Sequence, residues 1–290
     1  MPDWPYVKRS SPLTMRREII IIFLSVFGLL SGQVSYAQKH ETGFLDRSVA
    51  LSGDPYRFQV YLPPDYTRKK KWPVILFLHG TGESGDDGIL PTDHGIGTAI
   101  RRHRERFPAI VVFPQCRAKA VWFGTMEDQA LRALDQSVRE FNGDIQRIYL
   151  TGNSLGGYGT WQFAARHPGK FAAIAPVAGG IRPPEGFLMP AEIEKLAKKG
   201  DPFITIFLTN DPYAGVSRMI GRTPVWIFHG EKDERVPVTE ARKMYQELKA
   251  LGADVKYTEY ANKGHGITET AYAEPDLPAW LLSHKLNKQR

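Results

Sequence analysis

The sequence predicts a doubly wound α/β fold, in which a mostly parallel sheet is covered by helices on both faces. Short continuous apolar runs occur along the chain, as expected of strands that are buried on both faces. Segments with helical spacing of apolar residues lie between them, and this alternation is typical of α/β domains. The runs occupy residues 74–78, 110–113, 148–150, 172–178 and 225–228. Ligands of such folds bind at the carboxyl ends of the strands, where we expect the functional site.

The outer strands and two of the helices are predicted from periodicity. Residues 56–62 alternate apolar and polar, which predicts a half-exposed strand near one edge of the sheet. The more polar residues 255–260 predict a last strand close to the other edge. Apolar residues spaced by three and four predict helices over 131–141 and 241–251, and Gly252 is expected to end the second helix.

One connection between core strands is longer than the fold requires. About forty residues rich in Pro and Gly, 181–223, separate two core strands where a short connection would suffice. We therefore predict a lid or cap insertion at 181–223, with a helix over 190–199. The alternative is an elaborated connection without a function of its own.

The N-terminal segment has the layout of a signal peptide. The basic residues of MRR at 15–17 precede an apolar run at 19–30, and the small residues of SYA at 35–37 offer a cleavage point. We predict that residues 1–37 are removed after Ala37, which places the mature protein in the periplasm or outside the cell. An uncleaved anchor is the alternative, although the apolar run is short for a membrane span. Whether translation starts at Met1 or at Met15 stays open.

Composition indicates one globular domain, predicted over residues 38–290. The chain is 42% hydrophobic and 24% charged, which are ordinary values. Loss of residues 1–37 removes four basic and two acidic residues, so the formal net charge falls from +7 to +5. The basic clusters at 68–71 and 101–106 have no interleaved aromatic residues, and we expect no nucleic-acid partner. Cys116 is the only cysteine, which excludes a disulfide within the chain.

The sequence GNSLG, in which Ser154 is the central residue, is typical of a nucleophile elbow. It directly follows the apolar run 148–150 and precedes a segment of helical character. The flanking glycines permit a sharp turn from strand to helix that exposes Ser154 Oγ. The bare pattern is weak evidence, but this context predicts a serine hydrolase with Ser154 as its nucleophile.

A serine hydroxyl becomes a good nucleophile only when a base accepts its proton and a third group holds that base. His265 follows the last predicted strand in a loop between two glycines, and we predict it as the base. Asp233 follows the strand that ends near 228, so the chain order is nucleophile, acid, histidine, as in known hydrolases. Glu231 and Glu234 are rivals for the acid. The other histidines are expected at the surface or hydrogen-bonded to backbone, the latter for His79 and His229.

The loop HGTGESG at residues 79–85 follows the first buried strand and is expected to help stabilise an oxyanion. We predict the backbone N–H groups of Thr81 and Leu155 as the two donors. The loop also contains GxGxxG, but Pro91 and the preceding residues break the helix that a dinucleotide site requires. The acidic residues near His94 lack the spacing of metal ligands. We therefore expect neither a nucleotide cofactor nor a metal.

Together these motifs resemble the α/β-hydrolase superfamily, over residues 56–282. Within it they resemble secreted bacterial esterases of the phospholipase/carboxylesterase or polyhydroxybutyrate-depolymerase-like type, which border on prolyl-oligopeptidase-like hydrolases. The motifs are LFLHGTGESG, VVFPQC followed by VW, IYLTGNSLGGYGTW, PVWIFHGEKDERVP and KYTEYANKGHG. The resemblance implies an α/β-hydrolase fold, no cofactor, a triad and two oxyanion donors: Ser154, Asp233, His265, Thr81 and Leu155.

The resemblance also implies that Gln115 and Trp122 line the acyl or alcohol pocket, with plain packing as the alternative. Two departures from the family pattern affect substrate preference. The insertion 181–223 is longer than such relatives usually carry, and residues 266–268 replace a more frequent polar-aromatic sequence after the histidine. The natural ester is therefore not carried over from the family.

We expect an exported serine esterase that acts on a small or polymeric ester through an acyl-enzyme intermediate and has no stable membrane span after cleavage. A serine peptidase of the prolyl-oligopeptidase type is the alternative enzyme, because it would use the same triad. A non-catalytic binding module on the same fold is the alternative from another class. The oligomeric state stays open.

Overall fold

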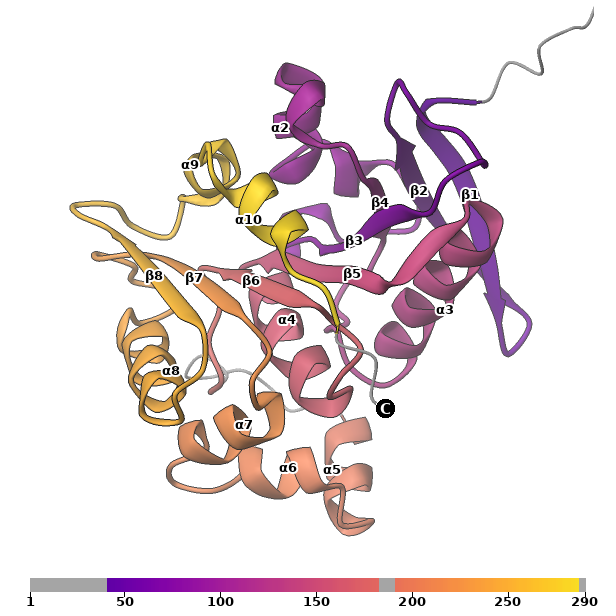
Figure 1. Ribbon diagram of the computed structural model, residues 1–290. Coiled ribbons are helices and arrows are strands. Elements are labelled where there is room, and N and C mark those ends of the chain that lie inside the picture. Colours follow the sequence, from indigo (N-terminus) through magenta and orange to yellow (C-terminus); the bar gives the residue numbers. More distant parts are fainter. Residues whose placement is uncertain (1–40, 183–190, 287–290) are drawn as a thin grey trace, which may run out of the picture. The chain divides into compact units, whose positions relative to one another are not determined.

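The computed structural model describes residues 41–182 and 191–286, and the predicted signal peptide lies outside them. Eight strands form one sheet in the order β1-β2-β4-β3-β5-β6-β7-β8 (Figure 1). β1 and β2 pair antiparallel, as do β2 and β4, and every other pair is parallel. The strands are β1 Gly43–Leu51, β2 Asp54–Leu62, β3 Trp72–Leu78, β4 Ile110–Pro114, β5 Gly143–Asn153, β6 Ala173–Val177, β7 Val225–Gly230 and β8 Val255–Tyr260.

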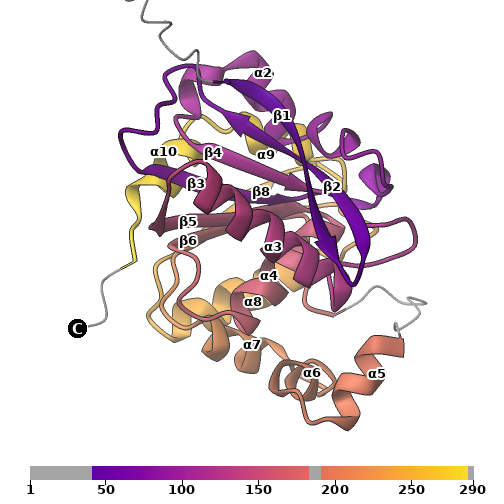
Figure 2. The same cartoon turned by 90° about the vertical axis from the view of Figure 1, so that its right-hand side faces the viewer.

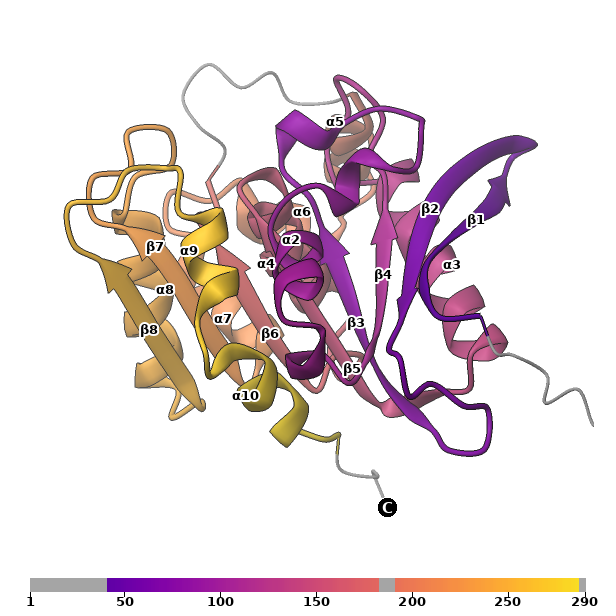
Figure 3. The same cartoon turned by 90° about the horizontal axis from the view of Figure 1, so that it is seen from above.

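Helices cover both faces of this sheet (Figure 2). The α-helices are α2 Ile96–Arg102, α3 Thr125–Glu140, α4 Leu155–Arg166, α5 Ala191–Lys198, α6 Pro202–Phe207, α7 Tyr213–Ile220, α8 Thr239–Ala250, α9 Thr268–Ala273 and α10 Leu277–Ser283. α3, α4, α7 and α8 pack on one face, and α2, α9 and α10 lie over the other (Figure 3). This doubly wound, mostly parallel architecture confirms the predicted fold class.

Each face has its own apolar core because successive strand side chains point to opposite sides. On β3, Val74, Leu76 and Leu78 belong to the core under α3 and α4, whereas Ile75 and Phe77 belong to the core under α2 and α9. All seven residues of β3 are buried, as the unbroken apolar run predicted. The sheet therefore forms a rigid support whose strand ends carry the loops of the site.

The predicted half-exposed strand at 56–62 is wrong in its exposure. β2 is buried from Phe58 to Leu62, and its polar Gln59 donates a hydrogen bond to Asp46 Oδ1 at 2.9 Å. The cause is β1, which was not predicted: it pairs along all of β2 and forms the edge of the sheet. At the opposite edge β8 is partly exposed along its length, as expected.

The predicted insertion contains three short helices, α5, α6 and α7, which lie beyond α4 in Figure 1. The helix predicted over 190–199 is found as α5, while residues 183–190 lie outside the described residues. In the part of the chain that the structure describes, no helix has the length and apolar character needed to cross a membrane.

Candidate active site

Ser154 lies at the tight turn between β5 and α4, where the chain reverses from strand to helix. Its φ is +54°, a conformation that non-glycine residues adopt rarely and that tight surrounding structure must enforce. The neighbouring glycines permit the turn because a Cβ on Gly156 would lie 1.8 Å from the carbonyl oxygen of Leu78, and one on Gly152 would lie 2.5 Å from it. The backbone N–H of Ser154 donates to Val177 O at 2.9 Å. The glycine pattern therefore has the structural role that the sequence predicted.

Three residues from distant parts of the sequence meet at this turn. His265 Nε2 lies 2.8 Å from Ser154 Oγ, and His265 Nδ1 lies 2.8 Å from Asp233 Oδ2. Because an ionised carboxylate only accepts, Nδ1 carries the proton that is donated to Asp233. Nε2 is then free to accept the hydroxyl proton of Ser154. This is the geometry that a general base requires to activate a serine.

Asp233, rather than its rivals, contacts His265, and its surroundings keep it ionised. Its Oδ1 accepts from the backbone N–H groups of Arg235 and Val236, both at 2.9 Å. Burial alone would raise the pKa of Asp233, but hydrogen bonds from His229, His265 and the Val236 N–H hold it well below its ordinary value. The sequence had not predicted the contact with His229, whose Nε2 lies 3.3 Å from Asp233 Oδ2.

Both glutamates that competed with Asp233 are exposed. Glu231 accepts a hydrogen bond from the backbone N–H of Asn262 at 2.7 Å, so it holds the neighbouring loop rather than the histidine.

The loop after β3 is held by a buried, neutral histidine. His79 Nδ1 donates to Gly80 O at 2.6 Å, and Nε2 accepts from the backbone N–H of Cys116 at 2.9 Å. Burial disfavours the charged imidazole and lowers the pKa of His79 to about 4. The backbone hydrogen bond expected of this residue is thus found at both nitrogens.

Thr81 and Leu155, the predicted oxyanion donors, both line the same cavity as Ser154. Thr81 begins a short 3₁₀-helix, Thr81–Glu83, and Leu155 begins α4. The first N–H group of a helix has no acceptor within that helix, so neither helix uses the N–H group of its first residue. Donors of this kind are what an anionic oxygen requires.

Gln115 lies away from the cavity that contains Ser154, whereas Trp122 lies in its wall. The Gln115 side chain is buried and is absent from the cavity lining; its Nε2 donates to Glu83 O at 3.0 Å and its Oε1 accepts from the Gly88 N–H at 2.6 Å. Both ends of its amide hold the loop after β3, which corrects the expected substrate contact. Trp122 lines the cavity and donates through Nε1 to His79 O at 3.0 Å.

A cavity of about 650 Å³ extends from Ser154 between α4 and the insertion. One wall comes from the insertion itself, through side chains that were not singled out from the sequence. They are Ile181, Ile193, Phe203, Ile204 and Phe207. The signal for the three on α6 was the apolar sequence FITIFL at residues 203–208.

Comparison with known proteins places the chain among serine hydrolases. The prolyl oligopeptidase family matches residues 123–284. The dipeptidyl-peptidase 5 of Porphyromonas gingivalis is 22% identical over 72% of this chain and 33% of its own length. An uncharacterized secreted protein of Arthroderma benhamiae is 27% identical over 92% of this chain and 28% of its own. The chain therefore spans about a third or less of the length of these curated relatives.

Solved structures give the same superfamily. A thermostable esterase superimposes with a TM-score of 0.63 and 28% identity, covering 83% of this chain and 63% of that one. A ferulic acid esterase superimposes with a TM-score of 0.63 at 15% identity, covering 83% of this chain and 97% of that one. The second likeness supports the α/β-hydrolase fold alone.

Proposed function

The chain belongs to the prolyl oligopeptidase family and is a serine hydrolase of the α/β-hydrolase type, and we propose that it cleaves carboxylic esters through an acyl-enzyme intermediate. The observation that carries the proposal is the hydrogen bond of 2.8 Å between Ser154 Oγ and His265 Nε2, inside a cavity that has room for an acyl group. The likeness to a thermostable esterase, which is 28% identical and covers 83% of this chain, supports an ester rather than an amide as the substrate of this protein.

In the acylation step, Ser154 Oγ attacks the ester carbonyl carbon while its proton passes to His265 Nε2. The carbonyl oxygen becomes anionic, and the N–H groups of Thr81 and Leu155 would stabilise it. Asp233 holds the imidazole in the required tautomer and stabilises the imidazolium that forms. The bond to the alcohol then breaks, and the alcohol leaves with the proton from Nε2.

Deacylation repeats these steps with water. His265 Nε2 removes a proton from water, the hydroxide oxygen bonds to the acyl carbon, and the bond to Ser154 Oγ breaks as the serine regains its proton. The carboxylic acid leaves. Trp122, in the cavity wall, is proposed to contact the bound group.

Replacement of the nucleophile tests this mechanism. We expect Ser154→Ala to lower kcat for a short-chain aryl ester by about a thousandfold, because no acyl enzyme can form. Ser48→Ala, an exposed serine on β1, is the matched control and should keep wild-type activity. Near-normal hydrolysis by a folded Ser154→Ala protein would contradict the mechanism. Labelling of Ser154 by a fluorophosphonate separates an enzyme from a binding module, which would stay unlabelled.

A peptidase is the second candidate function, supported by the family name and by the dipeptidyl-peptidase of Porphyromonas gingivalis. The same triad would serve it, so only substrates discriminate. A panel that pairs acyl esters with peptide anilides of matched acyl groups decides between them. We expect a higher kcat/KM for the esters beyond their intrinsic reactivity, measured against base-catalysed hydrolysis of each pair.

Export is also proposed, with residues 1–37 as the removed segment. Its support is the N-terminal sequence pattern and the relative from Arthroderma benhamiae, which is described as secreted. N-terminal sequencing of the protein recovered outside the cytoplasm should begin at Gln38. A start at Met1 or Met15 would contradict cleavage.

A further inference from the structure

One wall of the cavity is formed by a helix that has little stability of its own. α6 spans six residues, Pro202–Phe207, and helices of this length are unstable in isolation. It nevertheless contributes Phe203, Ile204 and Phe207 to the cavity lining, and the two phenylalanine rings stack with centroids 5.8 Å apart. The position of this wall therefore depends on what anchors α6 to the rest of the fold.

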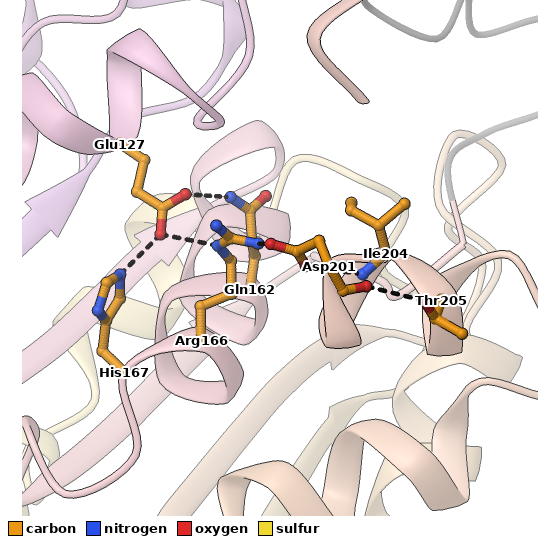
Figure 4. A network of polar contacts seen from close by, with 7 residues as sticks. All are labelled: Glu127, Gln162, Arg166, His167, Asp201, Ile204 and Thr205. Carbon is orange, nitrogen blue, oxygen red and sulfur yellow. Dashed lines mark hydrogen bonds and ion pairs between the residues drawn. The ribbon is translucent and has the colours of Figure 1, made fainter. Parts of the chain in front are cut away.

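The anchor lies at the first residue before the helix. Asp201 Oδ1 accepts from the backbone N–H of Ile204 at 3.1 Å, which caps the helix. Asp201 Oδ2 pairs with Arg166 Nη1 of α4 at 2.7 Å (Figure 4). One carboxylate thus both caps α6 and connects it to α4, the helix that directly follows Ser154.

Arg166 continues the contact into the interior. Its Nε lies 3.1 Å from Oε1 of Glu127 on α3, which also accepts from Gln162 Nε2 at 3.2 Å through its other oxygen. The side chains of Asp201, Arg166 and Glu127 are 15%, 20% and 5% exposed, so water screens them less than a surface pair. Burial lowers the pKa of Arg166, but Glu127 and Asp201 outweigh this and raise it.

This ion-pair chain, Asp201–Arg166–Glu127, also contacts two further residues that line the cavity, Phe123 and Gln162. The Arg166 guanidinium lies over the ring of Phe123 at 5.1 Å, and Gln162 is bonded to Glu127. Phe123 and Gln162 both line the cavity. The same charges therefore fix the wall on α6 and parts of the walls on α4 and before α3.

We infer that the ion-pair chain determines which esters the enzyme accepts: it holds α6 so that the cavity binds a bulky apolar group of the substrate, with Asp201 as a positioning residue. This inference rests on the proposed ester hydrolysis. Asp201 does not touch the reacting atoms. Its effect is carried by the apolar side chains of α6, whose contact with the substrate depends on the helix staying against α4.

Asp201→Asn tests the ion pair separately from the cap. An asparagine oxygen can still accept the Ile204 N–H, but the neutral amide no longer pairs with Arg166. The substrates are two pairs of esters: one pair compares a 3-phenylpropanoyl with an acetyl group on the same alcohol, and the other compares 3-phenylpropyl with methyl acetate. The wild-type protein should prefer the bulky member of at least one pair.

In Asp201→Asn that preference should fall about tenfold, mainly through a higher KM, because the bulky group loses apolar contacts. Activity on the small ester should change less than about twofold. A matched control is Asp135→Asn, which removes the charge from the half-buried Lys170–Asp135 pair of 3.2 Å, whose residues do not line the cavity. It should leave the preference unchanged.

Several outcomes would overturn the inference. These are a wild-type protein without preference for a bulky group, an unchanged preference in Asp201→Asn, or an equal loss on both members of a pair. Thermal unfolding of both variants shows whether an equal loss reflects general destabilisation. Failure of the wild-type protein to cleave any of the four esters would instead remove the proposed function itself.

Discussion

Two buried histidines, His79 and His229, lie at the ends of two core strands and support different parts of the site. Both imidazoles are fully buried. His79 uses both nitrogens on backbone groups, Gly80 O and the Cys116 N–H. His229 directs Nε2 to Val236 O at 2.9 Å and to the carboxylate of Asp233, while its Nδ1 has no partner among the described residues.

The two histidines differ in the groups that the following loop places in contact with the imidazole. The loop after β3 brings backbone within hydrogen-bond distance of His79, while its carboxylate Glu83 stays 4.0 Å from His79 Nδ1, so this residue is a scaffold for the loop that contains Thr81. The loop after β7 returns Val236 and Asp233 together to His229, so the same residue type contacts a proposed catalytic acid. Both histidines thus have a carboxylate four residues later, but only that of Asp233, at 3.3 Å, lies close enough to link its histidine to the site, a difference that the spacing in the sequence does not reveal.

Removing that carboxylate should have the largest effect. We expect Asp233→Asn to lower kcat by about a thousandfold, because an amide N–H₂ group facing His265 Nδ1 favours the wrong tautomer. The loop should stay folded, since the amide oxygen can still accept from the N–H groups of Arg235 and Val236. Steady-state kinetics on a short-chain ester measure the loss.

Glu231→Gln is the matched control for Asp233→Asn, because Glu231 is the adjacent acid that contacts Asn262 instead. Its kcat should stay within about twofold of the wild-type value. If the two variants lost similar activity, the assignment of Asp233 would be wrong.

His79 should affect the stability of the fold at mildly acid pH, with the next largest effect. Its pKa falls from 6.5 to about 4 on folding, so between these values the unfolded chain binds a proton that the native chain does not. The contribution of His79 to the free energy of unfolding is therefore fully present above pH 6.5. As the pH falls toward about 4, the free energy of unfolding decreases by about 3 kcal/mol. The corresponding window for Asp233, whose pKa is lowered, lies below its ordinary value of 3.8.

Urea unfolding across this window measures the effect in the wild-type protein and in His79→Gln. The variant should be less stable at neutral pH, because it loses a buried hydrogen bond, and should show a flatter pH dependence. The difference between the two curves isolates His79 from other titrating groups such as His284. Parallel curves would show that His79 does not carry this dependence.

Local sequence patterns were sufficient to predict the strands of the core and the turn formed by Gly152, Ser154 and Gly156. A strand buried on both faces must be apolar throughout, as residues 74–78 are, and the elbow requires Gly152 and Gly156 wherever it occurs. His265 and Asp233 followed from chain order, because parallel strands bring their carboxyl ends to one edge of the sheet. Each of these features follows from the composition of one segment or from its place in the order of the strands.

Features that depend on a distant partner were not predictable in this way. β1 is half polar, and only its pairing with β2 makes it a strand. Gln115 was expected in the substrate pocket, yet its two amide ends meet backbone groups of a loop about thirty residues away in sequence. Asp201 meets Arg166 across 35 residues. No local sequence pattern predicts such contacts, because a polar residue with a distant partner looks like any other polar residue of its segment.

The smallest predicted effect concerns the contact between His229 and Asp233, which has no counterpart at His79. It therefore tests the comparison of the two histidines most directly. His229→Phe removes the donor to Asp233 while keeping a ring of similar size. Loss of a hydrogen bond to a charged group should raise the pKa of Asp233 and lower kcat by about tenfold, with KM nearly unchanged. The more basic carboxylate also favours the protonated form of His265, which cannot accept the serine proton. The acid limb of the kcat profile should then move to higher pH.

His229→Gln is the conservative variant, because its amide nitrogen can still donate from about the position of Nε2. It should recover most of the lost kcat and the wild-type acid limb, whereas a purely structural histidine would be replaced equally badly by both residues. His79→Gln provides the opposite case: the pH dependence of its stability becomes flatter while the acid limb of its kcat profile stays in place, since His79 contacts no titrating member of the triad. If His229→Phe and His229→Gln shared one pH profile, Asp233 would be oriented by its two backbone N–H bonds alone.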